Sequence, residues 1–535
     1  MSKRGPGDRK PGGQGARGRG ASDSRRHPDR PARHDRRDRR DRGDRRDRGD
    51  RRDRGDRRDR RPAELYRVGQ EVDVVADHWS SRGEAVVRGG ALPLFVWHGI
   101  PGERARVRIV HRGQNQALGR FVEGRPPAPE RLDPPCDRYN VCGGGPVLHI
   151  RGDAQREMRR LSVVEALAGE GIRDVEVEPV VAAPRYREFR HLIKLGAGYS
   201  DLGHPRLGAF GRRDRQIVPI PSCPVATPEL REVMKIVSHH AIDLGIRPWL
   251  EGRGSLRYIV ARQSAMTGEV LITFVAGGGQ RFVRGLAEVV ERNCASVVGI
   301  HLHMNEGDGN SIFTRDEQGL LGTRRLVGKM FITDRLADVE YRIGPGDFFQ
   351  THPAMADRLY RDVVELAGAE EGVPVVDLYS GVGGFALALA AHTGWALGIE
   401  EVDGAVRRAR EAASAGGITA EFMQGTVAEV LPDITRRLSG RHPVVVVDPA
   451  RRGLEEGVVD AVLALQPRRV IYVSCSARSL ARDLRDFLQR GWTLGVVRPY
   501  DMFPHTSHVE VVSVLEPPAG SNLPTGRGPR RRVVR

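Results

Sequence analysis

The sequence predicts an α/β protein with a Rossmann-like parallel sheet in its last third, preceded by a mixed α/β region and a small β-barrel. Apolar runs alternate with helical patterns from residue 347 onward, which is typical of a parallel sheet with crossover helices. A glycine-rich turn follows the first of these runs. Nearer the start of the chain, short strand-like runs are closely punctuated by Gly and Pro. The expected segments are an N-terminal tail, the barrel, the central region, the parallel-sheet region and a C-terminal tail, at 1–62, 63–123, 124–345, 346–518 and 519–535.

Composition excludes several classes of protein. The chain has 535 residues, of which 39% are hydrophobic, enough for about two to four domains with real cores. It contains no apolar run of roughly 18 residues, so no membrane-spanning helix is expected. Its first residues are rich in Arg, Asp and Gly and lack the apolar core of a secretory signal. Five cysteines, an odd number in a long chain, do not form a secreted disulfide framework, so we expect a cytoplasmic protein.

The positive charge of the chain is concentrated in its tails. Of the formal net charge of +17, residues 1–62 contribute 25 Lys and Arg against 12 Asp, and residues 524–535 contribute five Arg and no acid. The folded body is therefore nearly neutral. The first segment repeats Gly-Asp-Arg-Arg-Asp-Arg three times from Gly43 to Arg60 and has almost no apolar residues, which predicts disorder. Such a tail can hold RNA phosphates through counterion release, and a purely solubilising tail is the alternative.

The barrel is expected from five strand-like runs within residues 65–122. Gly and Pro separate these runs at close spacing, as in small closed sheets. Such barrels commonly bind single-stranded nucleic acid, although the fold alone does not establish that function. The runs are Val74–Ala76, Glu84–Arg88, Leu94–Trp97, Ala105–Val110 and Ala117–Val122.

The central region mixes helices and strands. Residues Gln155–Glu170 predict a helix with one apolar face, because Met158, Leu161, Val164 and Leu167 recur at helical spacing. Three apolar runs after this helix predict strands. They are Arg257–Ala261, Glu269–Val275 and Ser296–His303.

A ligand site is expected where the parallel sheet begins. The run 374–378 leads through Gly381, Gly383 and Gly384 into a helical pattern, and these glycines let a ligand approach the backbone closely. Asp377 precedes the glycines, and Glu400 ends the next apolar run, where a carboxylate can accept hydrogen bonds from both hydroxyls of a ribose. An acid before the glycines favours a ligand with a cationic methionine group, namely S-adenosylmethionine. A packed turn in an unrelated α/β domain is the alternative.

Three further side chains lie next to apolar runs in the same part of the chain. Asp448 follows Val444–Val447, Cys475 follows the run that ends at Val473, and Glu510 precedes the last run. A lone Cys after a strand is usually a small core residue. Ligands bind at the carboxyl ends of parallel strands, however, so these residues and the glycine turn are expected to face one crevice. Cys475 is then a candidate nucleophile and Glu510 a candidate base.

At these residues the chain resembles the RNA 5-methyluridine methyltransferase family, from about Leu65 to Glu516. Tyr472–Cys475 and Met502–Glu510 are similar to the two signature patterns of that family, and Gly346–Gln350 resembles its cofactor-contacting segment. The barrel resembles its TRAM domain, notably at Trp97-His-Gly-Ile-Pro-Gly-Glu-Arg104. The resemblance implies a methyltransferase sheet with an antiparallel C-terminal strand. It also implies S-adenosylmethionine-binding residues, which are Gln350, Asp377, Tyr379, Gly381, Gly383, Glu400 and Asp448.

The resemblance further implies a mechanism. Cys475 attacks C6 of a uracil, C5 takes the methyl group, and Glu510 removes the C5 proton before Cys475 is released. The target uridine must be flipped or single-stranded. We expect a monomer acting on RNA, preferably 23S ribosomal RNA, with tRNA as the second possibility. A non-catalytic RNA-binding protein and a small-molecule methyltransferase are the alternatives from other classes.

The other cysteines depart from the family pattern. Cys136 and Cys142 resemble its iron–sulfur segment, and Cys223 resembles its distant fourth ligand, but Gly145 stands where many members have Cys. A four-iron cluster normally takes four thiolates. Either a cluster with three protein thiolates persists or the cluster has been lost; zinc on the three cysteines plus His149 is a further alternative.

Two smaller departures lie in the parallel-sheet region. Ser476-Ala477 stands where the family often has Asn-Pro after the nucleophile, which could alter that loop. Thr426 stands where an acid usually contacts the adenine.

Overall fold

The computed structural model describes residues 66–90, 92–212, 216–307, 309, 311–316 and 321–524. The tail predicted at 1–62 lies outside these residues, and the tail predicted at 519–535 is described only as far as residue 524. The described residues all belong to one compact unit of the chain. The three domain boundaries expected within it stay predictions.

The first described strands form a six-stranded sheet in the order β1-β5-β6-β4-β3-β2. Each of the five predicted runs overlaps a strand, and β2 was not anticipated. Inward side chains such as Leu94, Val107 and Ile109 form a small core, because alternate residues of a strand face the same side. Closure of this sheet into a barrel stays a prediction. The strands are β1 (Glu71–Val75), β2 (His78–Trp79), β3 (Ala85–Val87), β4 (Leu94–Trp97), β5 (Arg104–Arg112) and β6 (Ala117–Gly124).

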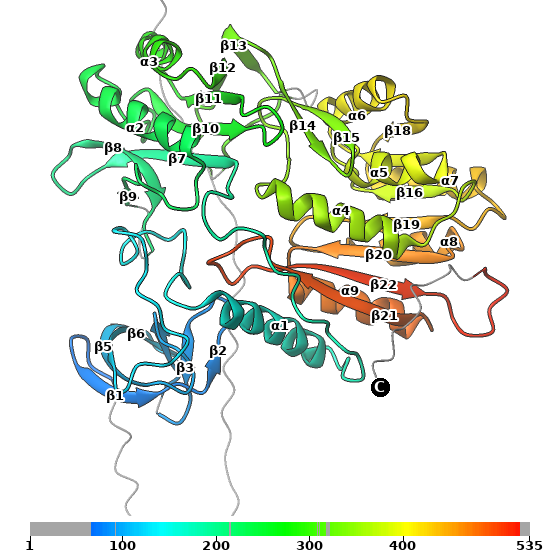
Figure 1. Ribbon diagram of the computed structural model, residues 1–535, viewed down its shortest axis with the longest axis horizontal. Helices are drawn as coiled ribbons and strands as arrows, with labels where there is room; N and C mark the ends of the chain where they lie inside the picture. Colours follow the sequence, from blue (N-terminus) through cyan, green and yellow to red (C-terminus); the bar gives the residue numbers. More distant parts are fainter. Residues whose placement is uncertain are drawn as a thin grey trace, which may run out of the picture. The chain divides into compact units, whose positions relative to one another are not determined.

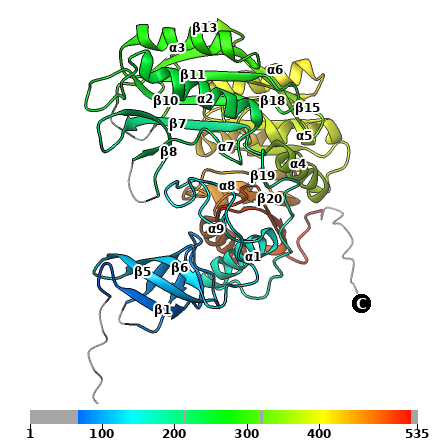
Figure 2. The same ribbon diagram turned by 60° about the vertical axis from the view of Figure 1, so that its left-hand side comes forward.

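Helix α1 (Gly152–Gly169) lies where a helix was predicted, but its buried face is different. Leu161 and Val164 are exposed, at 39% and 36%, so the predicted apolar face was wrong in these two positions. The helix instead buries two polar side chains beside its apolar ones, and part of it runs beside α9 (Ala477–Gln489) (Figures 1 and 2). Its buried residues are Gln155, Met158, Arg159, Val163 and Leu167.

The central region forms a seven-stranded mixed sheet in the order β13-β12-β11-β10-β7-β8-β9. Helices α2 (Pro228–Asp243) and α3 (Gln280–Asn293) pack on it through a continuous apolar core (Figure 1). The hairpin of β14 (Ile332–Leu336) and β15 (Val339–Ile343) leads into the next region. The sheet consists of β7 (Leu192–Tyr199), β8 (Pro205–Phe210), β9 (Ile217–Val218), β10 (Leu256–Gln263), β11 (Val270–Ala276), β12 (Val297–Met304) and β13 (Thr323–Gly328).

The C-terminal region confirms the predicted α/β sheet. Its order is β18-β17-β16-β19-β20-β22-β21, with β16 to β20 parallel and β22 antiparallel to both of its neighbours. The antiparallel C-terminal strand that the resemblance implied is therefore present. The strands are β16 (Val375–Leu378), β17 (Ala396–Glu400), β18 (Ala420–Gln424), β19 (Val444–Val447), β20 (Arg469–Ser474), β21 (Thr493–Tyr500) and β22 (Glu510–Glu516).

Helices cover both faces of this sheet (Figure 1). Val444 and Val446 contribute to the core under one layer, and Val445 and Val447 to the core under the other, which explains the uninterrupted apolar run. The first layer consists of α4 (Pro353–Ala367), α5 (Gly384–Thr393) and α6 (Asp403–Ala415), and the second of α7 (Val427–Arg437), α8 (Val458–Ala464) and α9.

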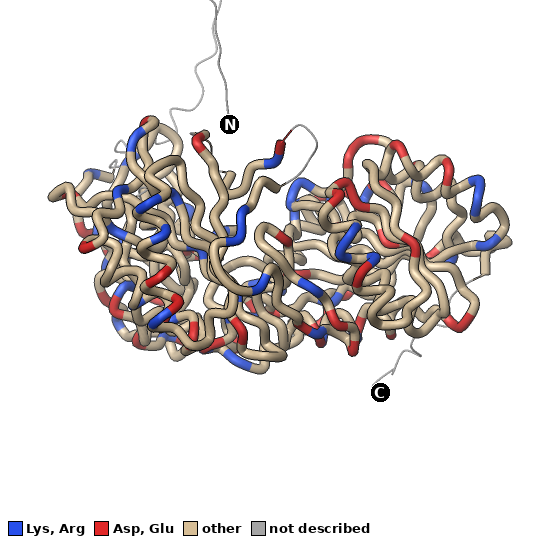
Figure 3. Tube along the Cα trace, turned by 90° about the horizontal axis from the view of Figure 1, so that it is seen from above, with Lys and Arg blue, Asp and Glu red and all other residues tan. Residues whose placement is uncertain are grey.

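Basic and acidic residues are interspersed along the described trace (Figure 3), in keeping with a nearly neutral body. No helix among the described residues is long and apolar enough to cross a membrane.

Candidate active site

Five strands of the C-terminal sheet bring the predicted residues to one edge. Across the sheet, β17 ends at Glu400, β16 leads into the glycine turn, β19 precedes Asp448, β20 precedes Cys475 and β22 begins at Glu510. Adjacent strands lie about 4.8 Å apart, so two strand spacings separate the glycine turn from Cys475 by on the order of 10 Å. The edge thus offers a ligand position over β16 and β17, and a thiol beside a carboxylate over β20 and β22.

Glu510 reaches this edge in an unexpected way. It begins a strand, whereas the other residues follow the ends of theirs. Because β22 is antiparallel to β20, with Val511 opposite Ser474, the start of β22 lies at the carboxyl end of β20. Glu510 is therefore placed beside Cys475, the residue after Ser474, although 35 positions separate them in the sequence.

Asp377 is fully buried at the end of β16. Its Oδ2 accepts a hydrogen bond of 2.8 Å from the backbone N–H of Ala386, near the start of α5. Burial raises the pKa of Asp377 well above its usual value, and the nearby charges of Asp448 and Glu400 raise it further. Its Oδ1 is buried without a hydrogen-bond partner among the described residues, as is Oγ of Ser380. Buried unpaired polar atoms of this kind mark a place where a polar ligand can bind.

The glycine turn is shaped for close approach. Gly381 and Gly383 have φ of 56° and 88°, the left-handed region that glycine adopts without strain. A Cβ on Gly381 would meet no atom within 4 Å, whereas one on Gly384 would lie 2.4 Å from Oη of Tyr360. The turn is open on its outer side and tightly packed against α4 on its inner side.

Glu400 is held by the backbone on both sides. Its Oε2 accepts a hydrogen bond of 2.9 Å from the N–H of Gly381, and its Oε1 accepts one of 2.9 Å from Val402. Each carboxylate oxygen keeps a second lone pair, so Glu400 can still accept two hydroxyl groups.

Asp448, which is half-buried, and Glu510, which is buried, form a pair of acids in the middle of the edge. Burial raises the pKa of both groups above the usual carboxyl range. The negative charge of Asp448 raises the pKa of Glu510 further, and Arg451 opposes this shift. A carboxylate of raised pKa is a stronger base once it is ionised, which suits proton removal.

Cys475 lies between these acids and a helix terminus. It is half-buried, and burial raises the pKa of its thiol to about 11, with Glu510 and Asp448 adding to the shift. A hydrogen bond and the charge of Arg451 lower the pKa in opposition. The helix α9 starts two residues later, and its N-terminal dipole also favours a thiolate.

The backbone segment that carries Gln350 is held in place by arginine side chains. The guanidinium of Arg262 donates to the backbone oxygens of Asp347, at 2.9 Å, and Phe349, at 3.3 Å. Arg408 forms an ion pair with the carboxylate of Asp347. The backbone next to Gln350 is thereby held against both the central sheet and α6.

Tyr360 and Arg451 are site residues that sequence reasoning missed. Tyr360 lies in α4, is hydrogen-bonded to the side chain of Gln350, and faces Asp448, Asp377 and Glu510. Burial and these three acids raise the pKa of its hydroxyl above the usual value, so it stays a neutral phenol. No local motif marks Tyr360. Arg451 could have been found, because it follows Asp448 closely in a loop that leaves the sheet edge.

Tyr379 follows β16 directly and is half-buried. Its φ of 66° is unusual for a residue with a side chain, and it turns the chain into the glycine turn. Burial raises the pKa of its hydroxyl to about 12. Its role in binding the cofactor stays a prediction.

The two departures from the family pattern both lie at helix starts. Thr426 caps α7: its Oγ1 accepts from the N–H of Glu429 at 3.3 Å, and Oε2 of Glu429 accepts from the N–H of Thr426 at 3.1 Å. Ser476 caps α9 by accepting from the N–H of Ser479 at 3.4 Å, with Ala477 as the first helical residue. At the N-cap of a helix Ser can replace Asn, and Ala can replace Pro at the first helical position. The loop after Cys475 therefore keeps a capped helix start.

The remaining predicted cysteines line a second candidate site, a cavity of about 550 Å³. Cys136, Cys142 and Cys223 all face it, together with Gly145 and His505. A Cβ on Gly145 would have its nearest neighbour at 3.8 Å, ordinary contact distance, so the position has room for a side chain. The structure therefore brings together all four positions that sequence reasoning grouped.

The zinc alternative finds no support in this cavity. His149 is not among the residues that line it, and its Nδ1 and Nε2 lie 2.5 Å from Oη of Tyr139 and 3.3 Å from the oxygen of Gly99. The three thiols also do not form a group with ligand atoms within 4.8 Å of one another among the described residues. Thiolates on one zinc ion lie about 4 Å apart.

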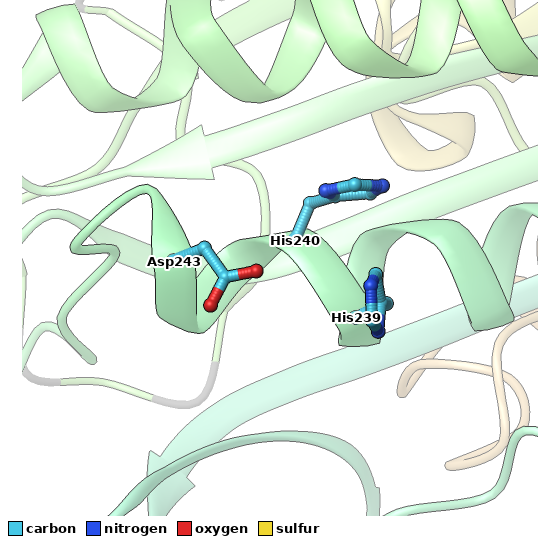
Figure 4. Close-up of side chains that lie close together, drawn as sticks. All are labelled: His239, His240 and Asp243. Carbon is cyan, nitrogen blue, oxygen red and sulfur yellow. The ribbon is translucent and has the colours of Figure 1, made fainter.

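One group with that close spacing does occur within the described ranges, on α2. It consists of His239, His240 and Asp243 (Figure 4). All three project from a single helix, and His239 and Asp243 are exposed. The group has neither a buried unpaired polar atom nor a cavity around it, so it carries no functional argument.

Comparison with known proteins agrees with this arrangement. The family model for tRNA (uracil-5-)-methyltransferase matches residues 315–517. An uncharacterized RNA methyltransferase from Gloeobacter violaceus is 33% identical over 84% of this chain and 97% of its own length. Another from Halalkalibacterium halodurans is 30% identical over 83% of this chain and 96% of its length. The crystal structure of a Pyrococcus abyssi tRNA (uracil-54, C5)-methyltransferase in complex with S-adenosyl-L-homocysteine superposes with a TM-score of 0.66 and 28% identity, covering 83% of this chain and all of that one.

Proposed function

Because the chain belongs to the RNA uracil-5-methyltransferase family and is an S-adenosylmethionine-dependent RNA methyltransferase, we propose that it methylates C5 of a uridine through a covalent adduct on Cys475. The observation that carries this proposal is the placement of Cys475 and Glu510 on adjacent strands, at the edge that also holds the glycine turn. A non-catalytic RNA-binding protein would have no need of this arrangement.

The residues present fit S-adenosylmethionine, which supplies the methyl group. The unpaired Oδ1 of Asp377 and the unpaired Oγ of Ser380 lie beside a glycine turn with open space above Gly381. Glu400 has lone pairs for the ribose hydroxyls, and Asp448 lies between the cofactor position and the catalytic pair. Gln350 and Tyr379 are the remaining proposed contacts. Titration of the wild type and of Glu400→Gln with S-adenosylmethionine tests this set. An unchanged dissociation constant in the variant would contradict the role of Glu400.

Cys475 makes the ring reactive. Uracil C5 is poorly nucleophilic, but a bond from Sγ to C6 moves the electron pair of the C5–C6 double bond onto C5 and O4 as an enolate. C5 then takes the methyl group. Glu510 removes the C5 proton, the C5–C6 double bond forms again, and the Sγ–C6 bond breaks to release the thiolate.

The charges at the edge set the order of these events. The thiol pKa of about 11 keeps Cys475 protonated in the free protein at neutral pH. Arg451, which is hydrogen-bonded to the thiol, lowers the pKa and is the group that stabilises the thiolate during attack. The cationic charge of the methyl donor favours thiolate formation in the same direction. The thiol is therefore expected to become nucleophilic only when the site is filled.

The preferred substrate is 23S ribosomal RNA, because the order of barrel and cysteine segment resembles the ribosomal members of the family. A tRNA is the second candidate, supported by the name of the matching family model and by the tRNA substrate of the Pyrococcus abyssi enzyme. Mapping 5-methyluridine in rRNA and tRNA, with and without this gene, separates them. A 5-methyluridine that disappears only from tRNA would overturn the ribosomal assignment.

Covalent catalysis has a direct test. RNA containing 5-fluorouridine has no C5 proton for Glu510 to remove, so its adduct with Cys475 should persist and be visible by mass spectrometry. If no adduct forms under conditions where the RNA binds, the enzymatic proposal is wrong.

We also propose that Cys136, Cys142 and Cys223 hold an iron–sulfur cluster in which one iron has no protein thiolate. The three thiols face one cavity large enough for more than a single ion, and Gly145 occupies the fourth corner. Iron and sulfide assays on anaerobically purified protein test this, and protein free of both would show that the cluster has been lost.

A further inference from the structure

We infer that Gln155 and Arg159 of α1 form a clamp on residues 501–509 and thereby position Glu510 for removal of the C5 proton. Residues 501–509 connect β21 to β22 and end directly before Glu510. The inference rests on the proposed function, because it concerns the base of that reaction. Both clamp residues are positioning residues, and neither lies at the sheet edge.

The side-chain amide of Gln155 is saturated with hydrogen bonds. Its Oε1 accepts from the backbone N–H of His505 at 2.9 Å and from Nη2 of Arg159 at 3.2 Å. Its Nε2 donates to the backbone oxygen of Ile150 at 2.7 Å and to Nδ1 of His505 at 3.2 Å. An amide has two donors and two acceptor positions, and all four are used here. The orientation of Gln155, and through it that of His505, is fixed.

His505 needs such support. Its φ of 66° costs energy for a residue with a side chain, and the conformation persists only where the surroundings impose it. Its Nε2 donates to the backbone oxygen of Tyr186 at 2.6 Å, and its own backbone oxygen accepts from the N–H of Val147 at 3.2 Å. The connection is therefore gripped at His505 by three separate segments of the central region.

Arg159 grips the same connection on both sides of His505. Its Nε donates to the backbone oxygen of Thr506 at 3.0 Å, and its Nη2 donates to that of Phe503 at 3.4 Å. Its Nη1 lies 3.1 Å from Oδ1 of Asp501, and both side chains are completely buried. A fully buried arginine is costly unless it is paired, and here one guanidinium contacts three residues of the connection.

The clamp acts on the base and not on the other parts of the site. The side-chain hydrogen bonds and ion pair of Gln155 and Arg159 go to the connection, to each other and to Ile150, and none goes to Cys475 or to the glycine turn. A nine-residue connection without helix or strand depends on contacts of this kind for a fixed conformation. Loosening it would displace the start of β22, where Glu510 is paired with Tyr500.

The test uses the full chain with two variants and one matched control. Gln155→Ala removes the contacts with His505. Arg159→Lys keeps a charge beside Asp501 but loses the fork that reaches two backbone oxygens. Arg160→Lys is the control, because Arg160 is the next residue on α1 and pairs with Glu157 on the solvent side. Thermal unfolding of each protein shows which variants are folded, and Gln155→Ala keeps the proposal testable if Arg159→Lys does not fold.

Two reactions separate the base from the nucleophile. Adduct formation with 5-fluorouridine RNA needs Cys475 and methyl transfer but no proton removal, and should stay within about twofold of the wild-type rate in both variants. With ordinary RNA as substrate, release of the 5-methyluridine product from the enzyme should slow by about 10- to 100-fold. The methylated covalent intermediate should then accumulate on ordinary RNA, as a protein–RNA band on denaturing gels that the wild type and Arg160→Lys do not show.

Each failure has its own pattern. If the wild type forms no adduct with 5-fluorouridine RNA, the proposed function and the clamp both fall. If the wild type forms the adduct but both reactions slow equally in the folded variants, or neither slows, the clamp alone is wrong.

Discussion

The two cysteine-containing sites of this protein are built in opposite ways. At the edge of the C-terminal sheet, Cys475 is one of several side chains positioned by five strands, and backbone N–H groups hold the carboxyl groups of Glu400 and Asp377. In the second cavity, Cys136 and Cys142 lie in an irregular segment, and Cys223 comes from a distant turn.

The difference bears on how each site responds to a single substitution. The two departures from the family pattern at Ser476 and Thr426 both preserve helix caps. The cavity has glycine at position 145, so the proposed cluster would have only three protein thiolates. A site made from the ends of paired strands stays assembled when one neighbour changes, whereas a site made from loops loses one ligand with one substitution.

The largest effect is expected at the sheet edge from Cys475→Ala. Without the thiol no adduct can form, so 5-methyluridine formation should fall below about 10⁻⁴ of the wild-type rate. RNA binding, measured by filter retention at fixed salt, should change little. Cys294→Ala is the control, because Cys294 is buried at the end of α3 away from both sites. Residual methylation near the wild-type level would refute the assignment.

Glu510→Gln should have the second largest effect. The amide keeps the shape of the side chain but cannot accept the C5 proton, so turnover should fall by about 10²- to 10⁴-fold. A methylated covalent intermediate should accumulate on ordinary RNA and be detected by mass spectrometry. Loss of the adduct with 5-fluorouridine RNA in this variant would instead place Glu510 in the attack step.

Gly145→Cys tests the proposed cluster by adding a fourth thiol to the cavity. The new thiol has room at its Cβ, so we expect the purified protein to hold about four irons and to keep them longer in air. Iron, sulfide and the visible absorption spectrum check this. Gly143→Cys is the matched control, because its Cβ would lie 3.2 Å from the oxygen of Phe210. Equal iron content in both variants and in the wild type would contradict the four-corner geometry.

The pH dependence of thiol reactivity distinguishes a thiol of raised pKa, as expected for Cys475, from a thiol whose pKa is lowered. A thiol with a pKa of about 11 is protonated at neutral pH, so its thiolate fraction increases with pH until that value is reached. Alkylation of Cys475 by iodoacetamide in the free protein should accelerate about tenfold per pH unit between roughly pH 7 and pH 10. Peptide mapping resolves Cys475 from the other cysteines. Arg451→Ala should slow the reaction at each pH, and a rate that levels off near neutral pH would contradict the raised pKa.

Thr426→Ala should have the smallest effect and shows whether this departure at the edge is structural. Loss of the cap on α7 should reduce the free energy of unfolding by about 1 kcal/mol. Denaturant unfolding measures the loss, and calorimetric titration should show an unchanged affinity for S-adenosylmethionine. A clear drop in that affinity without loss of stability would make Thr426 a cofactor contact.

The sequence predicted the sheet and most of the edge because the signals there are local. Apolar runs, the glycines before α5 and the residues next to each run are visible without tertiary structure. The antiparallel direction of β22 was expected only from the family resemblance, because no local sequence pattern shows in which direction a strand runs within a sheet. The TRAM barrel, the domain boundaries and the cofactor contacts remain predictions.

What sequence reasoning missed depends on contacts between distant segments. Tyr360 lies in an ordinary amphipathic helix, and only the packing of α4 against the glycine turn makes it part of the site. Leu161 and Val164 fit a helical apolar face, yet Gln155 and Arg159 are buried in that helix instead. Periodicity favours apolar residues as the buried ones, so a buried polar clamp is invisible to it.

The hydrogen bond between Gln155 and His505 can form only late in the synthesis of the chain. Its two residues are 350 positions apart, and a ribosome adding roughly 5–20 residues per second needs roughly 20–70 s to make the chain between them. Throughout that interval Gln155 and Arg159 of α1 lack the partners in residues 501–506 that cover them in the finished chain. Strand β20 is made before β21 and β22, so Cys475 is present in the nascent chain before the proposed base Glu510.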